Sequence, residues 1–345
     1  LARRPVFPGR CWLISLFAVR LGLPPLVGAL GLIEIWGRNG IANKGLSVLG
    51  VETPFSIYGL SGILIAHVFF NLPLAVRLIL PALERLPPEY WKTAANLGMG
   101  GFPLFRLVEW PAIRRSAAGA AGLVFMLCAT SFTLVLVLGG GPAATTLEVA
   151  IYQALRFDFN PGRAVLLSFI QVGLTLAVML ALRLFSVLTE EGRTSGGASI
   201  RPDVRGGLHI LPDAILIGLG LVFVAAPMLA VIVSGLSADL SRLVGDALFW
   251  RAAVTSLSIG LAAATLSVLI ASLLVRGRYS AGDRPETPVL ALLTGLSGAA
   301  GSLTLLVPPV VLGAGWFLML GGSTGQLLAP LAVIVLVNAL MALPF

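Results

Sequence analysis

The chain has 345 residues, of which 57% are hydrophobic and only 11% charged, and its mean hydropathy is +0.98. The polar side chains are too few to cover the surface of a soluble globular protein. The composition therefore excludes a soluble globular protein and predicts a membrane protein. The formal net charge of +8 would suit nucleic acid binding, but the positions of the basic residues give it another explanation.

Apolar stretches of about 20 residues recur along the chain, each long enough to cross a hydrocarbon core of roughly 30 Å as a helix. These stretches are unbroken rather than alternating, which favours helices over barrel strands. The predicted fold class is therefore all-α integral membrane, with about eight transmembrane helices. We expect the spans near residues 12–35, 58–80, 115–138, 163–187, 211–234, 251–275, 289–320 and 328–345.

The basic residues are unevenly divided between the loops. If residue 1 lies in the cytoplasm, sixteen of the 23 Lys and Arg residues fall in cytoplasmic loops and span ends, and six fall on the opposite side. The remaining one, Arg20, lies inside the first predicted span. This division follows the positive-inside rule and places residues 81–114 in the cytoplasm. The lipid bilayer thus accounts for the charge, and no nucleic acid partner is expected.

Residues that could carry catalysis or bind a metal are sparse. Cys11 and Cys128 lie in different spans, and His67 and His209, the only histidines, are about 140 residues apart. No catalytic residue, metal site or cofactor is predicted in this chain, and we expect that it is not an enzyme. The glycine run at 139–141 lacks the Lys-Ser/Thr of a phosphate loop, so the chain itself is not expected to hydrolyse ATP. His67 is expected to hydrogen-bond between packed spans or to face a pathway.

Two sets of similar strings predict two parallel tandem repeats. Leu23–Ala29 resembles Val307–Gly313, each with a proline pair inside an apolar span, and Phe70–Pro73 has a counterpart in Ala342–Pro344. The proline pairs are expected to bend their spans. The predicted organisation is a first repeat at 1–189, a mobile cytoplasmic linker at 190–210 and a second repeat at 211–345.

The chain starts without Met and stops inside an apolar run. We therefore expect a fragment, with the first repeat incomplete at its N-terminus and the second truncated before its own cytoplasmic loop.

The polar loop at 81–114 carries the most informative pattern. Prolines 87 and 88 stop the preceding span, and Glu89 to Leu97 are expected to form a short amphipathic helix with Tyr90, Ala94 and Leu97 on one face. Gly98 ends this helix, and Phe102 to Val108 can form a second one before Pro111. Two short helices at an angle make a knob that fits a groove on another protein. The alternative is a helix lying among the lipid headgroups.

The spacing of this loop resembles the E-A-A-x3-G-x9-I-x-L-P signature of bacterial ABC importer permeases, in which a short helix docks onto a separate ATPase subunit. The resemblance implies a type I ABC importer permease fold. Lys92 stands where that family usually has Glu, and Thr93 where it has Ala, so the docking salt bridge of that glutamate is not implied here. The residues implied to couple to the ATPase are Glu89, Lys92, Thr93, Ala94, Ala95, Gly98, Val108 and Pro111.

Longer strings are similar to thiamine ABC transporter permeases. This resemblance implies a multi-pass subunit of the bacterial inner (plasma) membrane that imports thiamine, or a phosphate ester of it. The implied partners are a periplasmic thiamine-binding protein and an ABC ATPase in two copies, which binds the ATP. A ferric-iron or polyamine permease of the same fold remains an alternative, and so do an ion-gradient-driven secondary transporter and, most remotely, a membrane enzyme. The strings are Ile65–Pro73, Val108–Pro111, Phe125–Cys128, Leu138–Leu155 and Asn338–Pro344.

Two sets of residues are candidates for the substrate side. Glu34 lies near Trp36, and a carboxylate beside an aromatic ring suits a cationic aromatic substrate such as thiamine. The alternative is an interfacial Trp anchor with a solvated Glu. Glu148, Tyr152 and Gln153 follow the glycine run and could line the outer mouth or contact the binding protein.

Overall fold

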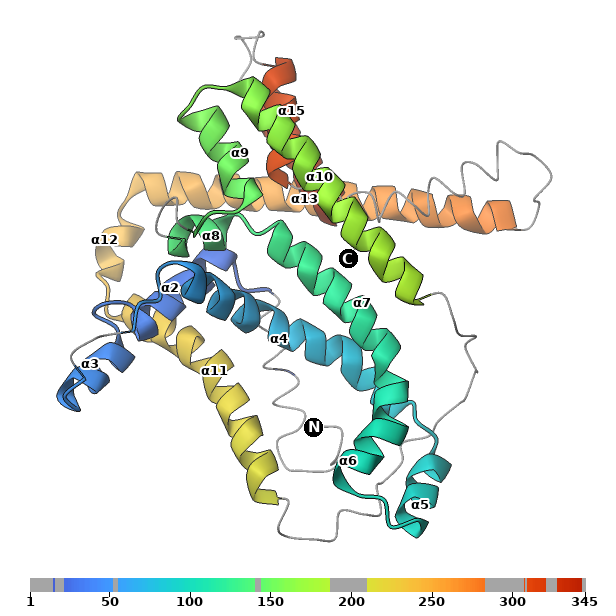
Figure 1. Ribbon diagram of the computed structural model, residues 1–345. Helices are drawn as coiled ribbons and strands as arrows, with labels where there is room; N and C mark the ends of the chain where they lie inside the picture. Colours follow the sequence, from blue (N-terminus) through green and yellow to red (C-terminus); the bar gives the residue numbers. More distant parts are fainter. Residues whose placement is uncertain are drawn as a thin grey trace. The chain divides into compact units, whose positions relative to one another are not determined.

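The computed structural model describes residues 22–51, 55–139, 144–186, 210–282, 309–320 and 328–342, together with Ser15 and Val307. Within these residues every regular element is a helix, as predicted (Figure 1). The chain divides into two compact units. Unit 1 comprises Leu1–Thr145 and Ala177–Gly235, and unit 2 comprises Thr146–Leu176 and Leu236–Phe345.

Four described helices are long and apolar enough to cross a membrane: α4 (Leu60–Glu84), α10 (Pro161–Ser186), α11 (Ile210–Leu236) and α13 (Ala247–Gly282). A fifth span results if the bent helical segments 101–114 and 116–129 are counted as one. The predicted spans at 12–35, 289–320 and 328–345 lie partly outside the described residues, so the count of eight is not confirmed. The predicted linker 190–210 is also outside them except for Ile210, and the tandem repeats stay a prediction.

In unit 1, α4 lies side by side with α7 (Trp110–Ala129), and α2 (Pro25–Trp36) and α8 (Thr133–Leu138) pack beside them (Figure 1). An amide joins the two long helices: Asn71 Nδ2 donates to His67 O within α4 at 2.9 Å and lies 3.4 Å from Cys128 Sγ in α7. Inter-helix polar contacts of this kind add to van der Waals packing in membranes. The middle of α4 is therefore tied to the C-terminal end of α7.

Helix α2 approaches its neighbours through glycines. A Cβ at Gly28 would collide with the Phe70 ring of α4, and a Cβ at Gly31 would collide with the backbone carbonyl of Pro227 in α11. Small residues allow such close contact between helix backbones, which is a main source of helix association in lipid. The two glycines therefore allow α2 to pack closely on the Phe70 ring of α4 and on the backbone of α11.

The described prolines of the two pairs stand where helices begin. Pro24 is the N-cap of α2 and Pro25 its first residue, and Pro309 begins α15 (Pro309–Leu320). Proline suits the first helical turn because the N–H it lacks would have no partner there. The bends expected inside these spans stay a prediction, because most of the residues before Pro24 and before Pro309 lie outside the described ranges.

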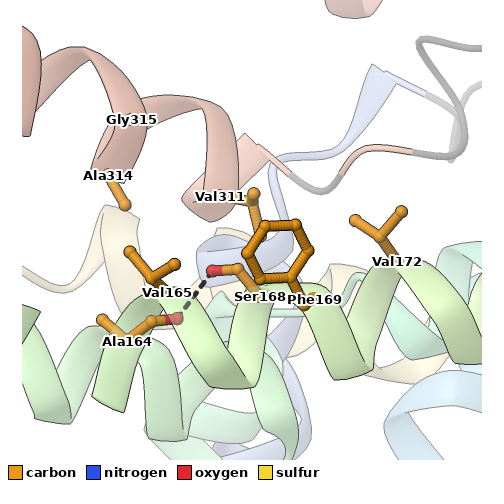
Figure 2. A pocket seen from close by; sticks show the side chains of 8 residues that line it. All are labelled: Ala164, Val165, Ser168, Phe169, Val172, Val311, Ala314 and Gly315. Carbon is orange, nitrogen blue, oxygen red and sulfur yellow. Dashed lines mark hydrogen bonds between the residues drawn. The ribbon is translucent and has the colours of Figure 1, made fainter. Parts of the chain in front are cut away.

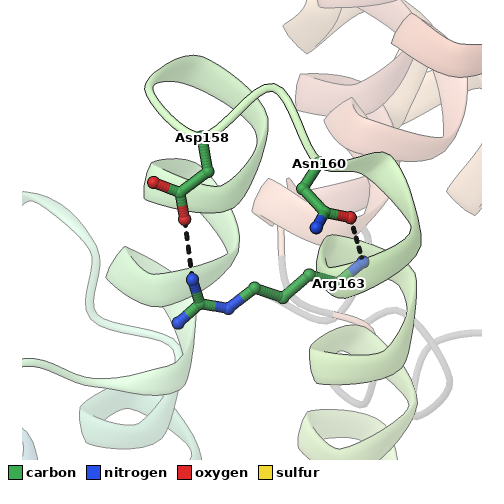
Figure 3. Close-up of polar contacts among 3 residues, drawn as sticks. All are labelled: Asp158, Asn160 and Arg163. Carbon is green, nitrogen blue, oxygen red and sulfur yellow. Dashed lines mark hydrogen bonds and ion pairs between the residues drawn. The ribbon is translucent and has the colours of Figure 1, made fainter.

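Unit 2 contains α9 (Leu147–Arg156), the first part of α10, α12 (Leu240–Val244), α13, α15 and α16 (Leu328–Ala342). Helix α9 packs on α15, and α13 packs on α16. At the exposed α9–α10 connection, the Arg163 side chain pairs with Asp158 at 2.7 Å and the Arg163 N–H donates to Asn160 Oδ1 at 3.0 Å (Figure 3).

A single buried amide organises the segment after α2. Asn43, in α3 (Ile41–Val48), donates to the carbonyls of Gly37 and Phe55, each at 2.8 Å, and accepts the Phe55 N–H at 3.0 Å. The Trp36 and Phe55 rings meet edge to face at 5.7 Å between centroids. Backbone groups that no regular element pairs are thus satisfied by one side chain.

We expect Asn43→Ala to lower the stability of the protein markedly. The substitution removes the Asn43 partner of the Phe55 N–H and C=O, whereas Gly37 O keeps the Gly40 N–H, and each group left unpaired costs about 1–3 kcal/mol. Thermal unfolding of the detergent-purified protein measures the loss. Asn39→Ala is the matched control, because Asn39 is exposed in the same segment. Equal melting temperatures for the two variants would contradict the structural role of Asn43.

Candidate functional site

Two short helices form a hairpin between α4 and α7 (Figure 1). Helix α4 ends at Glu84, and α5 (Pro88–Asn96) begins at the second proline of the pair, with Pro87 as its N-cap. Helix α6 (Gly101–Leu104) follows after four residues. The sequence prediction of a helix over 89–97 is confirmed to within one residue, because proline at the first turn and glycine after the last turn mark both ends.

The turn between α5 and α6 depends on Gly98. Its φ of +62° lies in the left-handed region, which residues with a Cβ rarely adopt. The Gly98 N–H donates to Ala95 O at 3.0 Å, and the Met99 N–H donates to Ala94 O at 2.9 Å. These bonds pair the last carbonyls of α5 and end the helix, as predicted.

The hairpin has its own small apolar interior. Trp91, Ala94 and Leu104 are buried there, and Leu86, Met99 and Val108 pack around them. Of the three residues predicted at helical spacing on one face, Ala94 is buried in this interior, whereas the Tyr90 and Leu97 side chains are 56% and 70% exposed. Helix α6 covers the side of α5 that carries Trp91, so the larger indole is buried and the tyrosine is not.

The outer face of the hairpin combines charge and exposed apolar surface. Glu89, Lys92 and Thr93 are exposed on α5, and so are Tyr90 and Leu97. Exposed apolar groups rimmed by polar residues are typical of protein interaction sites. The predicted coupling residues thus divide by position: Ala94 and Val108 support the hairpin from inside, whereas Glu89, Lys92 and Thr93 face outward.

The second half of the signature is continuous with the long helix α7. A π-helical turn, η2 (Phe105–Glu109), connects α6 to α7, and the Trp110 N–H donates to Phe105 O. The prediction that this helix ends before Pro111 was wrong. Pro111 lies in the first turn of α7, where the wide turn before it accommodates the missing N–H. The hairpin is therefore joined to α7 without an intervening loop.

The other candidates in unit 1 do not converge on one site. Glu34 is exposed on α2, and the half-buried Trp36 ring packs on Phe55. His67 lies in α4 with Nε2 buried and without a hydrogen-bond partner in the described part of the chain. The contact expected of a histidine between spans is made by Asn71 instead, which the sequence pattern did not single out.

Helix α9 carries the most unusual carboxyl group among the described residues. Glu148 is fully buried, and neither of its oxygens has a hydrogen-bond partner. Burial raises the pKa of the Glu148 carboxyl from 4.5 to about 8. Tyr152 lies one turn farther along α9 and meets the Phe157 ring edge to face at 6.0 Å. The carboxyl is therefore neutral at pH 7 in this arrangement.

The raised pKa of Glu148 predicts a pH dependence of stability. Between about pH 4.5 and about pH 8 the folded protein holds this proton while the unfolded chain releases it, so stability falls as pH rises through the window. We expect Glu148→Gln to reduce that fall in melting temperature, and Asp158→Asn, at an exposed carboxylate, to leave it unchanged. Identical pH profiles for wild type and Glu148→Gln would contradict the prediction.

A hollow of about 240 Å³ lies in unit 2 between α10 and α15 (Figure 2). Its one polar side chain, Ser168, donates its hydroxyl to Ala164 O at 2.8 Å, so the wall is apolar. The lining residues are Ala164, Val165, Ser168, Phe169, Val172, Val311, Ala314 and Gly315. In the part of the chain that the structure describes, no three His, Cys, Asp or Glu side chains gather where they could hold a metal ion.

The helical fold and the hairpin between two spans define an inner membrane transport component, and comparison with known proteins agrees. Residues 1–189 match the family model described as "Binding-protein-dependent transport system inner membrane component". The chain belongs to this family.

Individual relatives extend the similarity beyond the first half. The chain is 49% identical over 339 residues to the thiamine transport system permease protein ThiP of Brucella suis, covering 98% of this chain and 61% of that protein. It is 42% identical over 340 residues to the ThiP protein of Escherichia coli, covering 98% of this chain and 62% of that protein. The chain thus spans about three fifths of the length of these curated relatives.

A more distant relative shares a shorter region. The sulfate transport system permease protein CysT of Salmonella typhimurium is 30% identical over 190 residues, covering 54% of this chain and 65% of that protein. No solved structure matches the chain.

Proposed function

We propose that this chain is part of the membrane-spanning permease of an ATP-driven importer of thiamine. The observation that carries the proposal is the α5–α6 hairpin: a rigid knob with an apolar interior of its own, an outer face carrying Glu89, Lys92 and Thr93, and a continuous helical connection to α7. Membership of the binding-protein-dependent family supports the importer class. Similarity to ThiP proteins over 98% of the chain supports thiamine as the substrate.

The partners follow from this role. A separate ABC ATPase, in two copies, binds ATP and receives the outer face of the hairpin in a groove. A periplasmic binding protein delivers thiamine on the opposite side of the membrane. The mixed outer face of the hairpin suits such docking, because exposed Tyr90 and Leu97 supply apolar anchors within a polar rim.

Coupling is mechanical. When the ATPase subunits close, the hairpin moves as one body because Trp91, Ala94 and Leu104 lock α5 onto α6. The motion enters α7 through η2, and α7 carries α4 with it through their long contact and the Asn71–Cys128 tie. The membrane helices then rock between inward-open and outward-open arrangements.

Importers of other substrates, and transporters driven by another energy source, are expected to behave differently from a thiamine importer. The ferric-iron, polyamine and sulfate importers are separated by the ligand that the cognate binding protein retains. An ion-gradient-driven transporter has no use for a cytoplasmic docking hairpin.

The test is uptake of radiolabelled thiamine into proteoliposomes that hold the purified transporter, its ATPase and its binding protein. We expect uptake that requires ATP on the side of the membrane where the ATPase sits and persists when the proton gradient is collapsed. Uptake that continues without ATP and stops with the gradient would contradict the importer proposal. ATP-driven uptake of another ligand, with none of thiamine, would contradict the substrate alone.

A further inference from the structure

Glu148 is a buried acid whose oxygens have no protein partner. It occupies the first turn of α9, its exposed fraction is 0%, and neither Oε1 nor Oε2 accepts or donates a hydrogen bond in the described structure. Burying a carboxyl group without a partner is costly. Ionisable groups in the interior of a transport protein are retained where they act on the transported species.

Other described acids lack this combination. Glu34 and Glu89 are exposed to solvent, and Asp158 is half-exposed and pairs with Arg163 at 2.7 Å. Glu109 is buried but has an interaction partner. Glu148 therefore differs from these acids because it is buried and has no hydrogen-bond partner.

Within unit 2, Glu148 shares a face of α9 with residues that contact α15. Ile151 and Leu155 follow at spacings of three and seven residues, so they share a face of α9 with Glu148. These two residues belong to the apolar cluster that contains Val310 and Val311 of α15. By this spacing, Glu148 is on the side of α9 that packs on α15.

This contact joins the two predicted repeats, because α9 precedes the predicted linker and α15 follows it. The hollow between α10 and α15 borders the same cluster, since Ala164 and Val311 belong to both (Figure 2). An apolar hollow that borders the same cluster as a buried acid is the chemistry that receives an organic cation with an apolar ring.

We propose that Glu148 is the counter-charge for the cationic ring of the transported molecule, reached when the contact between α9 and α15 opens. This inference rests on the proposed function and adds the residue that recognises the substrate. In the closed arrangement the carboxyl group keeps its proton, so no unpaired charge is buried. When the cation arrives, the carboxyl O–H releases its proton to water and the carboxylate pairs with the cation, so the net charge of the site does not change.

The test separates substrate transfer from energy coupling. The assembled transporter in proteoliposomes, with saturating thiamine-loaded binding protein, is measured for thiamine uptake and ATP hydrolysis together. We expect Glu148→Gln to keep binding-protein-stimulated ATP hydrolysis and to raise the ATP consumed per thiamine imported by about tenfold or more, as loss of a bond to a charged partner implies. Glu148→Asp, which keeps the charge, should recover part of the transfer.

Asp158→Asn is the matched control, because it removes an exposed carboxylate from the same α9–α10 connection, and we expect wild-type stoichiometry. A Glu148→Gln transporter with wild-type stoichiometry would overturn the inference and leave the proposed function intact. Equal losses in Glu148→Gln and Glu148→Asp would also overturn it, because they indicate a packing role. Failure of the wild-type transporter to import thiamine would instead contradict the proposed function.

Discussion

Gly98→Pro is expected to abolish ATP-driven uptake while the protein still inserts into the membrane. Proline holds φ near −65°, whereas Gly98 has a φ of +62°, so the α5–α6 turn cannot form. Proline also removes the N–H that donates to Ala95 O. Without the turn, Leu104 no longer covers Trp91, and the hairpin loses the interior that makes it rigid.

A graded series strengthens this prediction. Gly98→Val keeps the N–H but places a β-branched residue in the left-handed region, at a cost of about 1–2 kcal/mol or more. We therefore expect a partial loss of uptake. Gly100→Val is the matched control, because Gly100 has an extended backbone with φ of −139° and open space around it. Uptake, ATP hydrolysis and membrane content are measured together. Full uptake by the Gly98→Pro variant, at a normal amount of the protein in the membrane, would contradict the coupling role.

Gly31→Ala is expected to destabilise the helix packing of unit 1. A Cβ at position 31 meets the backbone carbonyl of Pro227 rather than the end of a flexible side chain, so α2 and α11 must move apart. Overpacking of this kind costs about 1–3 kcal/mol. The packing that suffers includes Val224 of α11, which is fully buried against Val76 of α4. The melting temperature and yield of purified protein measure the effect.

The matched control for Gly31→Ala lies in the partner helix of the same contact. A Cβ added at Gly220 of α11 would enter open space, with no atom within 4 Å. Because alanine favours helix more than glycine does, Gly220→Ala should be as stable as wild type or more so. If Gly31→Ala and Gly220→Ala melt at the same temperature, the close approach of α2 and α11 does not contribute to stability.

Features that depend on local sequence were predictable. Long apolar runs predicted α4, α10, α11 and α13, because lipid allows few alternatives to a continuous helix. The hairpin was predictable for the same reason: Pro88 begins α5 and Gly98 ends it through backbone preferences that need no partner. Neither proline nor glycine depends on tertiary contacts for this effect.

Features that depend on where another element packs were not predictable. Tyr90 and Trp91 are neighbours on a short helix, and the position of α6 decides which of them is buried. Asn43 looks like any polar loop residue, because its partners at Gly37 and Phe55 are set by the folded path of the chain. The sequence pattern selected Glu148 by its place after the glycine run, but burial without a partner is a property of the packed structure.

The signature itself shows both kinds of information. Its spacing correctly predicted the two short helices. The second helix was expected to end before Pro111, but it continues through η2 into α7. Single π-helical turns are rare and interrupt otherwise α-helical segments, so the periodicity of apolar residues did not predict this one. The proposed coupling role depends on this continuity with α7.

The sidedness and partner of the hairpin are tested most directly by labelling Thr93→Cys with a membrane-impermeant maleimide, in a background where Cys11 and Cys128 are serine. Thr93 is exposed on the outer face of α5, and Ser47→Cys, on α3, serves as the control for the opposite side. We predict that Cys at 93 reacts only from the cytoplasmic side and is protected when the ATPase subunit binds, whereas Cys at 47 reacts only from the periplasmic side. Labelling of position 93 from the periplasm, or no reaction from either side in the absence of the ATPase, would contradict the account of the hairpin as a cytoplasmic docking knob.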